Sequence, residues 1–391
     1  MKCLLISYFI TTNSHMKIKK ILFILTLLFI SVSYAQNTHS HSHERIIDFP
    51  DIPGYKTLTC DLHQHSVFSD GEVWPSIRVQ EALKDGLEAI SITEHLEYQP
   101  HKDDIPHPDR NRSFEIAKNE AEGHDLMVIN GAEITREMPP GHANAIFLKD
   151  ANLLNFEDVI EAFREANKQG AFTFWNHPNW IAQRPDGVAT LTDLHRQLIN
   201  EGLLHGIEVV NEYTYSDEAL QIALDHNLTI MGTSDIHGLI DWQFKVPEGG
   251  HRPITLVFAR EHTEKALKEG LKQRRTVVWF NNLLIGNTEF IVPLIESSIL
   301  VKKVIPLSSY KGESLVEQVT IENISDTDFI LENLSGYTLH NSADVVEVKA
   351  KSNTIIEIKT LEAKPVLAIR FRVLNAVTAP NTHPEIVVKI R

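Results

Sequence analysis

The chain has 391 residues, of which 42% are hydrophobic and 23% are charged, with only 18 glycines and 17 prolines. This composition excludes collagen-like, intrinsically disordered and multi-span membrane proteins. The net charge of −15 argues against a surface for nucleic acid or anionic membrane, and two cysteines cannot form a disulfide scaffold.

The first 35 residues have the three parts of a secretory signal peptide. Lysines precede the apolar run 21–30, and small residues precede a cleavage site after Ala35. The apolar run is about half the length that spans a bilayer, so we expect no membrane anchor. Met16 is an alternative start for this signal. These features predict export to the periplasm or the cell exterior, with Cys60 as the one cysteine that remains after cleavage.

A rhythm of strands and helices follows the signal. Residues 36–55 form a polar, His-rich segment that we interpret as a flexible leader. From 56 to 285, strand-like apolar runs alternate with helical periodicity, which is clear between 159 and 166. The strand-like runs are 58–63, 89–93, 126–134, 143–148, 171–176, 206–210, 229–232, 254–259 and 277–280.

This rhythm predicts an α/β fold. Strands that alternate with helices form βαβ units and a largely parallel sheet. About seven such units fit a closed or distorted (β/α) barrel better than an open doubly wound sheet. The chain also lacks the Gly-rich phosphate loops that would support the open alternative.

The character of the chain changes after the barrel. Between 286 and 391, segments such as 316–321 and 345–348 alternate apolar and polar residues between clusters of turn residues. We see no convincing amphipathic helix in this region. The pattern predicts a small antiparallel β domain, a sandwich that packs against the barrel.

Histidines and acids lie where the predicted strands end. They are His63, His65, Asp70, His95, Glu133, His142, His177, Asp235 and His237. Residues i and i+2 of a strand point to the same side, so His63 and His65 can reach one metal. Strand ends converge on one face of a barrel, so we expect all nine side chains to meet there. Imidazole with carboxylate suits zinc, manganese or iron.

These motifs resemble the PHP family, the polymerase-and-histidinol-phosphatase metallo-phosphoesterases. The resemblance covers roughly 56 to 282 and rests on Asp61-Leu62-His63-Gln64-His65-Ser66, Ser69-Asp70-Gly71, Thr93-Glu94-His95, Glu133, His142, His177 and Ser234-Asp235-Ile236-His237. It implies a distorted (β/α)7 barrel that holds two or three divalent metal ions. The second motif commonly reads Thr-Asp-His in this family, and Glu94 replaces that acid here.

The resemblance also implies roles for these residues. His63, His65, Glu133 and Asp235 would hold the first metal. Glu133 would bridge to a second metal, held also by His142 and His177. Asp70, His95 and His237 would hold the third.

Such a site is suited to hydrolysis of a small-molecule phosphate ester. Phosphoryl transfer requires an activated nucleophile and neutralised equatorial oxygens, and a hydroxide that bridges two metals would attack phosphorus in line. Arg136, Arg184 and Arg252 lie on loops near the ligand-bearing strands and are candidates to bind the phosphate. The general acid is not identified by the sequence, and Glu94 is one candidate.

Two alternatives stay open. Metal-dependent hydrolases of the amidohydrolase type, which cleave C–N or C–O bonds, also carry His-X-His on the first strand of a barrel and an Asp late in the chain. A non-catalytic secreted protein that binds metal or carbohydrate is the second alternative. Charge and export disfavour a DNA-directed nuclease, and the sequence does not decide between monoesters and diesters.

Overall fold

The computed structural model describes residues 46–307, 316–360 and 367–390. The expected signal peptide and the first half of the expected leader, residues 36–45, lie outside the described residues. Residues 46–55, which we expected to belong to the flexible leader, are instead part of the folded domain, because Ile47, Phe49 and Ile52 are buried in its core. In the part of the chain that the structure describes, no helix is long and apolar enough to cross a membrane.

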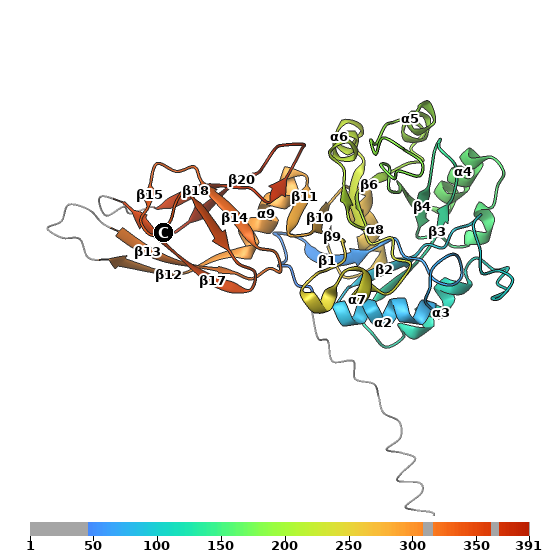
Figure 1. The fold of residues 1–391 in the computed structure, drawn as a ribbon, viewed down its shortest axis with the longest axis horizontal. Coiled ribbons are helices and arrows are strands. Elements are labelled where there is room, and N and C mark those ends of the chain that lie inside the picture. The colour runs from blue at the N-terminus through green and yellow to red at the C-terminus, as the bar shows by residue number, and fades with distance from the viewer. Residues whose placement is uncertain (1–45, 308–315, 361–366, 391) are drawn as a thin grey trace, which may run out of the picture. The chain divides into compact units, whose positions relative to one another are not determined.

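Strands and helices alternate through the first part of the chain (Figure 1). The strands are β1 (Lys56–Asp61), β2 (Ala89–Ile92), β3 (Met127–Ile134), β4 (Ala143–Ile146), β5 (Phe172–Trp175), β6 (Gly206–Asn211), β7 (Thr214–Tyr215), β8 (Thr229–Thr233), β9 (Ile254–Ala259), β10 (Thr276–Phe280) and β11 (Leu283–Gly286). The helices are α2 (Pro75–Asp85), α3 (Arg112–Glu120), α4 (Val159–Gln169), α5 (Asp193–Asn200), α6 (Asp217–His226), α7 (Ile240–Gln243) and α8 (Glu264–Lys272). Two 3₁₀ turns cover Ala151–Leu154 and Val246–Glu248.

Local sequence sets the ends of these helices. In α4, the side chain of Asp158 accepts a hydrogen bond from the backbone of Ile160, and Gly170 ends the helix with a φ of 83°. Ala162, Phe163 and Ala166 form its buried face. The apolar spacing therefore folds as a surface helix that packs on the sheet.

The predicted distorted barrel is confirmed, but its sheet is mixed. β1, β2 and β3 are parallel, as are β5, β6 and β8. β4 is antiparallel to both of its neighbours, as are β9 and β10, and β11 is antiparallel to β10. The expectation of a largely parallel sheet fails at these strands. Short connections without a crossover helix account for the antiparallel pairs β3–β4 and β10–β11, whereas β4–β5 and β9–β10 are antiparallel although α4 and α8 lie between their strands. The segment that follows β8 pairs with the segment that follows β1 through a β-bridge between Ile236 and Gln64.

The C-terminal region is an antiparallel β-sandwich, as predicted. One sheet contains β12 (Ile299–Leu307), β13 (Val316–Asn323), β17 (Ser352–Lys359) and β15 (Thr338–Leu339). The other contains β16 (Val345–Val348), β14 (Phe329–Asn333), β18 (Ala368–Val373) and β20 (Glu385–Lys389). Alternating side chains of β13 and β18 are buried, which is the pattern that the sequence predicted.

The join between the domains contains a helix that the sequence reading missed. α9 (Thr288–Ser298) buries Phe290, Ile291, Leu294 and Ile295, and Pro293 lies inside it. Apolar residues on most of its surface hide the helical period, so the expectation of no helix after the barrel is wrong. The short strand β19 (Ala376–Val377) returns to pair with β11, which ties the sandwich to the barrel sheet.

Candidate metal centre

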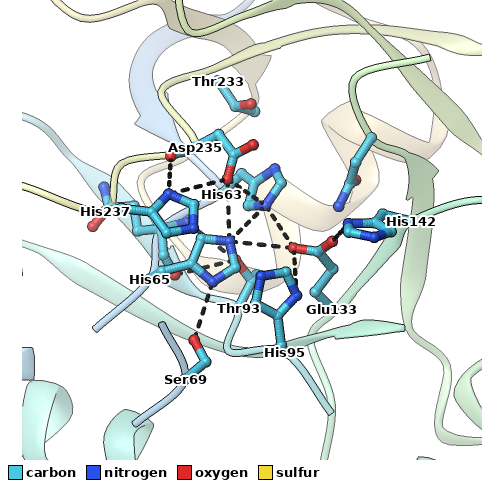
Figure 2. Close-up of polar contacts among 12 residues, drawn as sticks. His63, His65, Ser69, Thr93, His95, Glu133, His142, Thr233, Asp235 and His237 are labelled. Carbon is cyan, nitrogen blue, oxygen red and sulfur yellow. Dashed lines mark hydrogen bonds and ion pairs between the residues drawn. The ribbon is translucent and has the colours of Figure 1, made fainter. Parts of the chain in front are cut away.

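The side chains expected to bind metal come together where the barrel strands end, as Figure 2 shows. His63 and His65 follow β1, and Asp235 follows β8. Oδ1 of Asp235 lies 3.1 Å from Nε2 of each of these histidines. Oε2 of Glu133, in β3, lies 3.0 Å from Nε2 of His63 and 3.2 Å from that of His65. The ligand atoms of this buried group of four residues all lie within 4.8 Å of one another.

A second group forms around Asp70. Its Oδ1 lies 3.3 Å from Nε2 of His95 and 3.1 Å from Nε2 of His237. The rings of His95 and His237 each stack on His65, with centroids 4.5 and 4.4 Å away. The three residues that the resemblance assigns to a third metal therefore lie together, and His65 joins them.

The last two candidates, His142 and His177, approach different carboxylates. Nδ1 of His142 lies 2.5 Å from Oε1 of Glu133, and these two residues form a third group with His95. Nε2 of His177 lies 3.8 Å from Oδ2 of Asp235. The two rings are neighbours, with centroids 5.0 Å apart. The resemblance assigns both histidines to one metal, and the structure brings their rings together without placing both on Glu133.

Glu208 supports this centre and was missed by the sequence analysis. It is 1% exposed in β6. Its Oε1 accepts hydrogen bonds from His63 Nδ1 at 2.8 Å and Thr233 Oγ1 at 2.6 Å. Its Oε2 accepts from the backbone N–H of His177 at 2.7 Å and from Asn211 Nδ2 at 2.9 Å. An acid within an apolar strand was the signal that could have identified it.

A buried arginine fixes two of the ligand-bearing loops. Arg78, on the inner face of α2, is fully buried. Its Nε donates to the backbone oxygen of His65 at 2.8 Å, and its Nη2 donates to that of His237 at 2.7 Å. Two ligands from opposite ends of the barrel sequence are thus held by one guanidinium group.

Arg252 lies in a buried ion-pair network outside the lining of the cavity described below, so the structure does not support its assignment to phosphate binding. The side chain is fully buried. Its Nη1 lies 3.2 Å from Oδ2 of Asp61, and its Nη2 lies 2.9 Å from Oδ2 of Asp85. Asp61 also accepts hydrogen bonds from the backbone and hydroxyl of Ser234. This network joins β1, α2 and the end of β8 beneath the metal centre.

Glu94 is also not placed to act as a general acid. It is 5% exposed and is absent from the lining of the cavity described below. Its oxygens accept hydrogen bonds from the backbone and hydroxyl of Ser66 and, at 2.5 Å, from the hydroxyl of Ser69. Glu94 therefore holds the loop after β1 in place, which explains an acid at this position without a role in proton transfer.

The other two arginine candidates lie outside the cavity lining. Nη2 of Arg136 is 3.0 Å from Oε1 of Glu97 and donates to the backbone oxygen of Phe156. Nη2 of Arg184 donates to the backbone oxygen of Thr190 at 2.5 Å. Both guanidinium groups are therefore engaged with their own loops.

A cavity of ≈ 350 Å³ borders the metal centre. Six of the nine candidate ligands line it, namely Asp70, His95, His142, His177, Asp235 and His237. The ring of Trp180 lies 5.6 Å from that of His142 and 5.2 Å from that of His177, and Tyr98 packs against His95. None of the described residues that line this cavity is Lys or Arg. Asn211 and Glu212 complete one side of the wall.

The electrostatics of the cluster fit a cation. Burial would raise the pKa of Glu133, but the neighbouring rings of His95 and His142 hold it well below its usual range. Burial would lower the pKa of His65, but hydrogen bonds to Asp235 and Glu133 raise it to about 10. A cation that binds here therefore displaces protons from histidine rings.

Buried polar atoms in the cluster support the same fit. Oδ1 of Asp70, Oε1 of Glu133 and Nδ1 of His142 are buried and have no hydrogen bond of suitable geometry, and the groups within ion-pair distance of them are other members of the cluster. Such atoms require an explanation because an unsatisfied buried polar group is costly. Carboxylate and imidazole atoms that converge in this way are the ligand set of a divalent cation.

Comparisons with known proteins agree with this geometry. A model of the PHP domain matches residues 61–236, and the model DUF5001, described as an Ig-like domain, matches residues 305–389. An uncharacterized protein of Methanocaldococcus jannaschii, MJ1295, is 38% identical over 200 residues, which cover 47% of this chain and 85% of that protein. A crystal structure from Bacteroides vulgatus is 42% identical with a TM-score of 0.81, and the match covers 88% of this chain and 98% of that one. It is described as a two-domain protein that contains a predicted PHP-like metal-dependent phosphoesterase.

Proposed function

This chain belongs to the PHP family, and from that premise we propose that it is an exported phosphoesterase that hydrolyses a small-molecule phosphate ester. The observation that carries the proposal is the convergence of the His, Asp and Glu side chains on one cavity. Membership of the family and the cluster of His, Asp and Glu ligands support a metal-dependent hydrolase. The phosphate ester and the export are the parts that we propose.

Two or three divalent cations, of zinc, manganese or iron, would occupy the centre. His63, His65, Glu133 and Asp235 would hold one, and Asp70, His95 and His237 would hold another. His142 and His177 would complete a third position with Glu133. Divalent cations in such a centre supply an activated water molecule and neutralise phosphate oxygens.

The protein prepares its ligands through their outer hydrogen bonds. The Nδ1–H of His63 donates to Glu208, which turns Nε2 towards Glu133 and Asp235, where its lone pair would be available to a cation that displaces the Nε2 proton. Nδ1 of His95 lies 2.6 Å from the hydroxyl of Thr135, which fixes that ring in the same way. Orientation of this kind is set before any ligand binds.

The cavity suits a small substrate. A volume of ≈ 350 Å³ lies within the usual range for small-molecule sites, and the net charge of −15 disfavours a nucleic acid. Trp180 and Tyr98 offer ring surfaces on which an organic group could pack. Export is supported by the signal-like residues 1–35, and an external enzyme of this kind would release phosphate or an alcohol from esters outside the cell.

Hydrolysis of p-nitrophenyl phosphate and bis-p-nitrophenyl phosphate tests the proposal. The purified chain from Gln36 onward is treated with chelator and then loaded with zinc, manganese or iron. We expect metal-dependent release of nitrophenol from at least one of the two esters, and loss of release in a His63→Ala/Asp235→Ala double variant. His340→Ala, at a 49% exposed side chain of the C-terminal domain, is the control and should retain activity.

Each negative result has a defined meaning. A fully metal-loaded protein that releases no nitrophenol would contradict the phosphoesterase proposal, and amide and lactone substrates would then test the amidohydrolase alternative. Export is tested separately by N-terminal sequencing of the protein from a bacterial host. A mature chain that begins at Gln36 in the periplasm or medium is expected, and an uncleaved intracellular chain would contradict export.

A further inference from the structure

Glu212 stands between two cavities. The first is the cavity at the metal centre, and the second, of ≈ 520 Å³, shares Glu212 with it. Tyr213, Phe244, Lys245 and Phe280 contribute to the wall of the second cavity. A molecule that occupied both cavities would have the Glu212 carboxyl group beside the bond that joins its two halves.

Glu212 holds an unfavourable backbone conformation. It begins the two-residue turn between β6 and β7, where Asn211 pairs with Thr214, and its φ is 48°. Glycine is favoured at such a position, and strained non-glycine residues cluster at functional sites. His177 and Asp235, which line the same cavity, also have positive φ values, of 27° and 47°. Strain is therefore concentrated on this wall of the cavity.

The second cavity suits an organic group that contains a ring. The rings of Tyr213 and Phe244 lie 5.4 Å apart, and Tyr213 is 55% exposed. Gln243 and Lys245 add an amide and an ammonium group to the wall. Aromatic walls with a few polar groups are typical of small-molecule sites of this volume.

Apart from the charge of bound cations, the described lining of the metal cavity favours an ester with one negative charge over an ester with two. The cavity's described lining has no Lys or Arg, and Glu212 adds a carboxyl group. A phosphomonoester carries about −1.5 to −2 charges at pH 7. A phosphodiester carries one fewer ionisable oxygen and has a second organic arm, so it can place its phosphate and one arm at the metal centre and the other arm in the second cavity.

We propose that the substrate is a phosphodiester whose leaving arm lies in the second cavity, and that Glu212 donates a proton to the leaving oxygen. This inference rests on the proposed phosphoesterase function. An oxygen of water forms a bond to phosphorus, and the bond from phosphorus to the leaving oxygen breaks. The leaving oxygen keeps the electron pair and takes the proton of Glu212, and the proton lost by the water returns to the carboxylate through solvent. The products are a phosphomonoester and an alcohol or phenol.

The surroundings of Glu212 are consistent with a proton donor. Burial is the main cause that raises its pKa, and the hydrogen bond from Gln243 opposes this shift without reversing it. The other charged groups that line the second cavity are Lys245 and Glu248. A general acid is most effective when its pKa lies near the working pH, and a raised pKa brings a glutamate closer to that range.

Two diesters with different leaving groups test this role. Bis-p-nitrophenyl phosphate releases a stable phenolate that requires little protonation, whereas diphenyl phosphate releases one that requires more. In Glu212→Gln we expect kcat to fall by about 100-fold or more on diphenyl phosphate and by less than about 10-fold on bis-p-nitrophenyl phosphate. Glu218→Gln, a matched change at an exposed residue of α6, should leave both rates unchanged.

A binding measurement tests the second cavity without turnover. Tyr213→Ala should raise KM for both diesters with little change in kcat, and calorimetric titration with p-nitrophenol should show at least about 3-fold weaker binding than in the wild type. An unchanged affinity for p-nitrophenol would overturn the proposal that the leaving arm binds in the second cavity. This measurement tests the proposal even if Glu212→Gln does not fold.

The remaining outcomes separate the two proposals. Equal losses on both diesters in Glu212→Gln, or a wild type that hydrolyses only p-nitrophenyl phosphate, would overturn this inference and leave the phosphoesterase proposal standing. A metal-loaded wild type that cleaves no phosphate ester would overturn both.

Discussion

The role of Glu208 leads to a sharp prediction about metal affinity. Each of its oxygens accepts two hydrogen bonds, from His63 and Thr233 on one side and from His177 and Asn211 on the other. Glu208→Gln keeps the shape of the side chain but replaces one oxygen with an NH₂ group. Towards His177 and Asn211 the NH₂ group meets two N–H donors, and towards His63 and Thr233 it fits only if the imidazole and the hydroxyl accept instead of donating. An unsatisfied buried group costs about 1–3 kcal/mol, so we expect a lower free energy of unfolding by about that amount.

The same change acts on the ligand atom of His63. With the amide nitrogen towards Nδ1, the ring has to carry its proton on Nε2, the atom that faces Glu133 and Asp235. Loss of an outer-shell partner of this kind typically lowers metal affinity by about 10- to 100-fold, which is about 1.4–2.7 kcal/mol. We therefore expect Glu208→Gln to bind zinc or manganese at least about 10-fold more weakly than the wild type.

Chelator competition at fixed pH measures this affinity independently of turnover. Glu218→Gln is the matched control, since it makes the same chemical change at an exposed residue. Thermal unfolding of both variants is followed in parallel. A Glu208→Gln protein with wild-type metal affinity would refute the reasoning, because the proposed control of the His63 proton would then have no effect.

Three further predictions concern the fold and its metal. Arg252→Met leaves Asp61 and Asp85 buried without their cation, so urea unfolding should show a free energy of unfolding lower by about 3–5 kcal/mol. The KM of the folded fraction should stay within about 2-fold of the wild-type value. A large rise in KM would restore Arg252 as a substrate residue. Removal of metal by chelator should lower the melting temperature, because a ligand at 100 times its Kd adds about 2.7 kcal/mol to the free energy of unfolding. Equal melting curves with and without metal would count against a metal site. Burial lowers the pKa of His195 and of His205 to about 4, below about 6.5 in the unfolded chain, so their stabilisation is complete above pH 6.5 and is lost as the pH falls towards 4. In that window the slope of the unfolding free energy against pH reports how many more protons the unfolded chain binds, and His195→Gln should reduce that number by about one. An unchanged slope would contradict the lowered pKa of His195.

The candidate ligands could be predicted because their signal is local. His63 and His65 are two residues apart at the end of an apolar strand, as are Asp235 and His237, and each pair needs only strand geometry to be placed on one side. The order of strands then places these ends on the same face of a barrel. The barrel and the sandwich were predictable for the same reason, since each rests on short-range periodicity.

The arginines were not predictable in this way. Arg252 lies 191 residues from Asp61 and 167 from Asp85, and no local pattern tells a loop arginine that binds substrate from one that fills a buried ion pair. Arg78 occupies the apolar face of α2, where periodicity alone predicts a hydrophobic residue. Burial and partners at long range decide such roles, and one sequence does not contain them.

Asp61 shows how the barrel and the metal centre depend on each other. It lies two residues before His63, so strand geometry directs it to the same side as His63 and His65. In the described part of the chain, the segments that follow β1 and β8 are joined by a single β-bridge, from Gln64 to Ile236. Asp61 adds hydrogen bonds from the backbone and hydroxyl of Ser234 at 3.1 and 2.6 Å. Asp61 therefore contributes to this closure, together with Thr255 and Thr276, whose hydroxyls donate to backbone oxygens of β8. It also helps to set the distance between the ligands that follow β1 and those that follow β8, so a weakened closure and a loss of metal affinity should occur together.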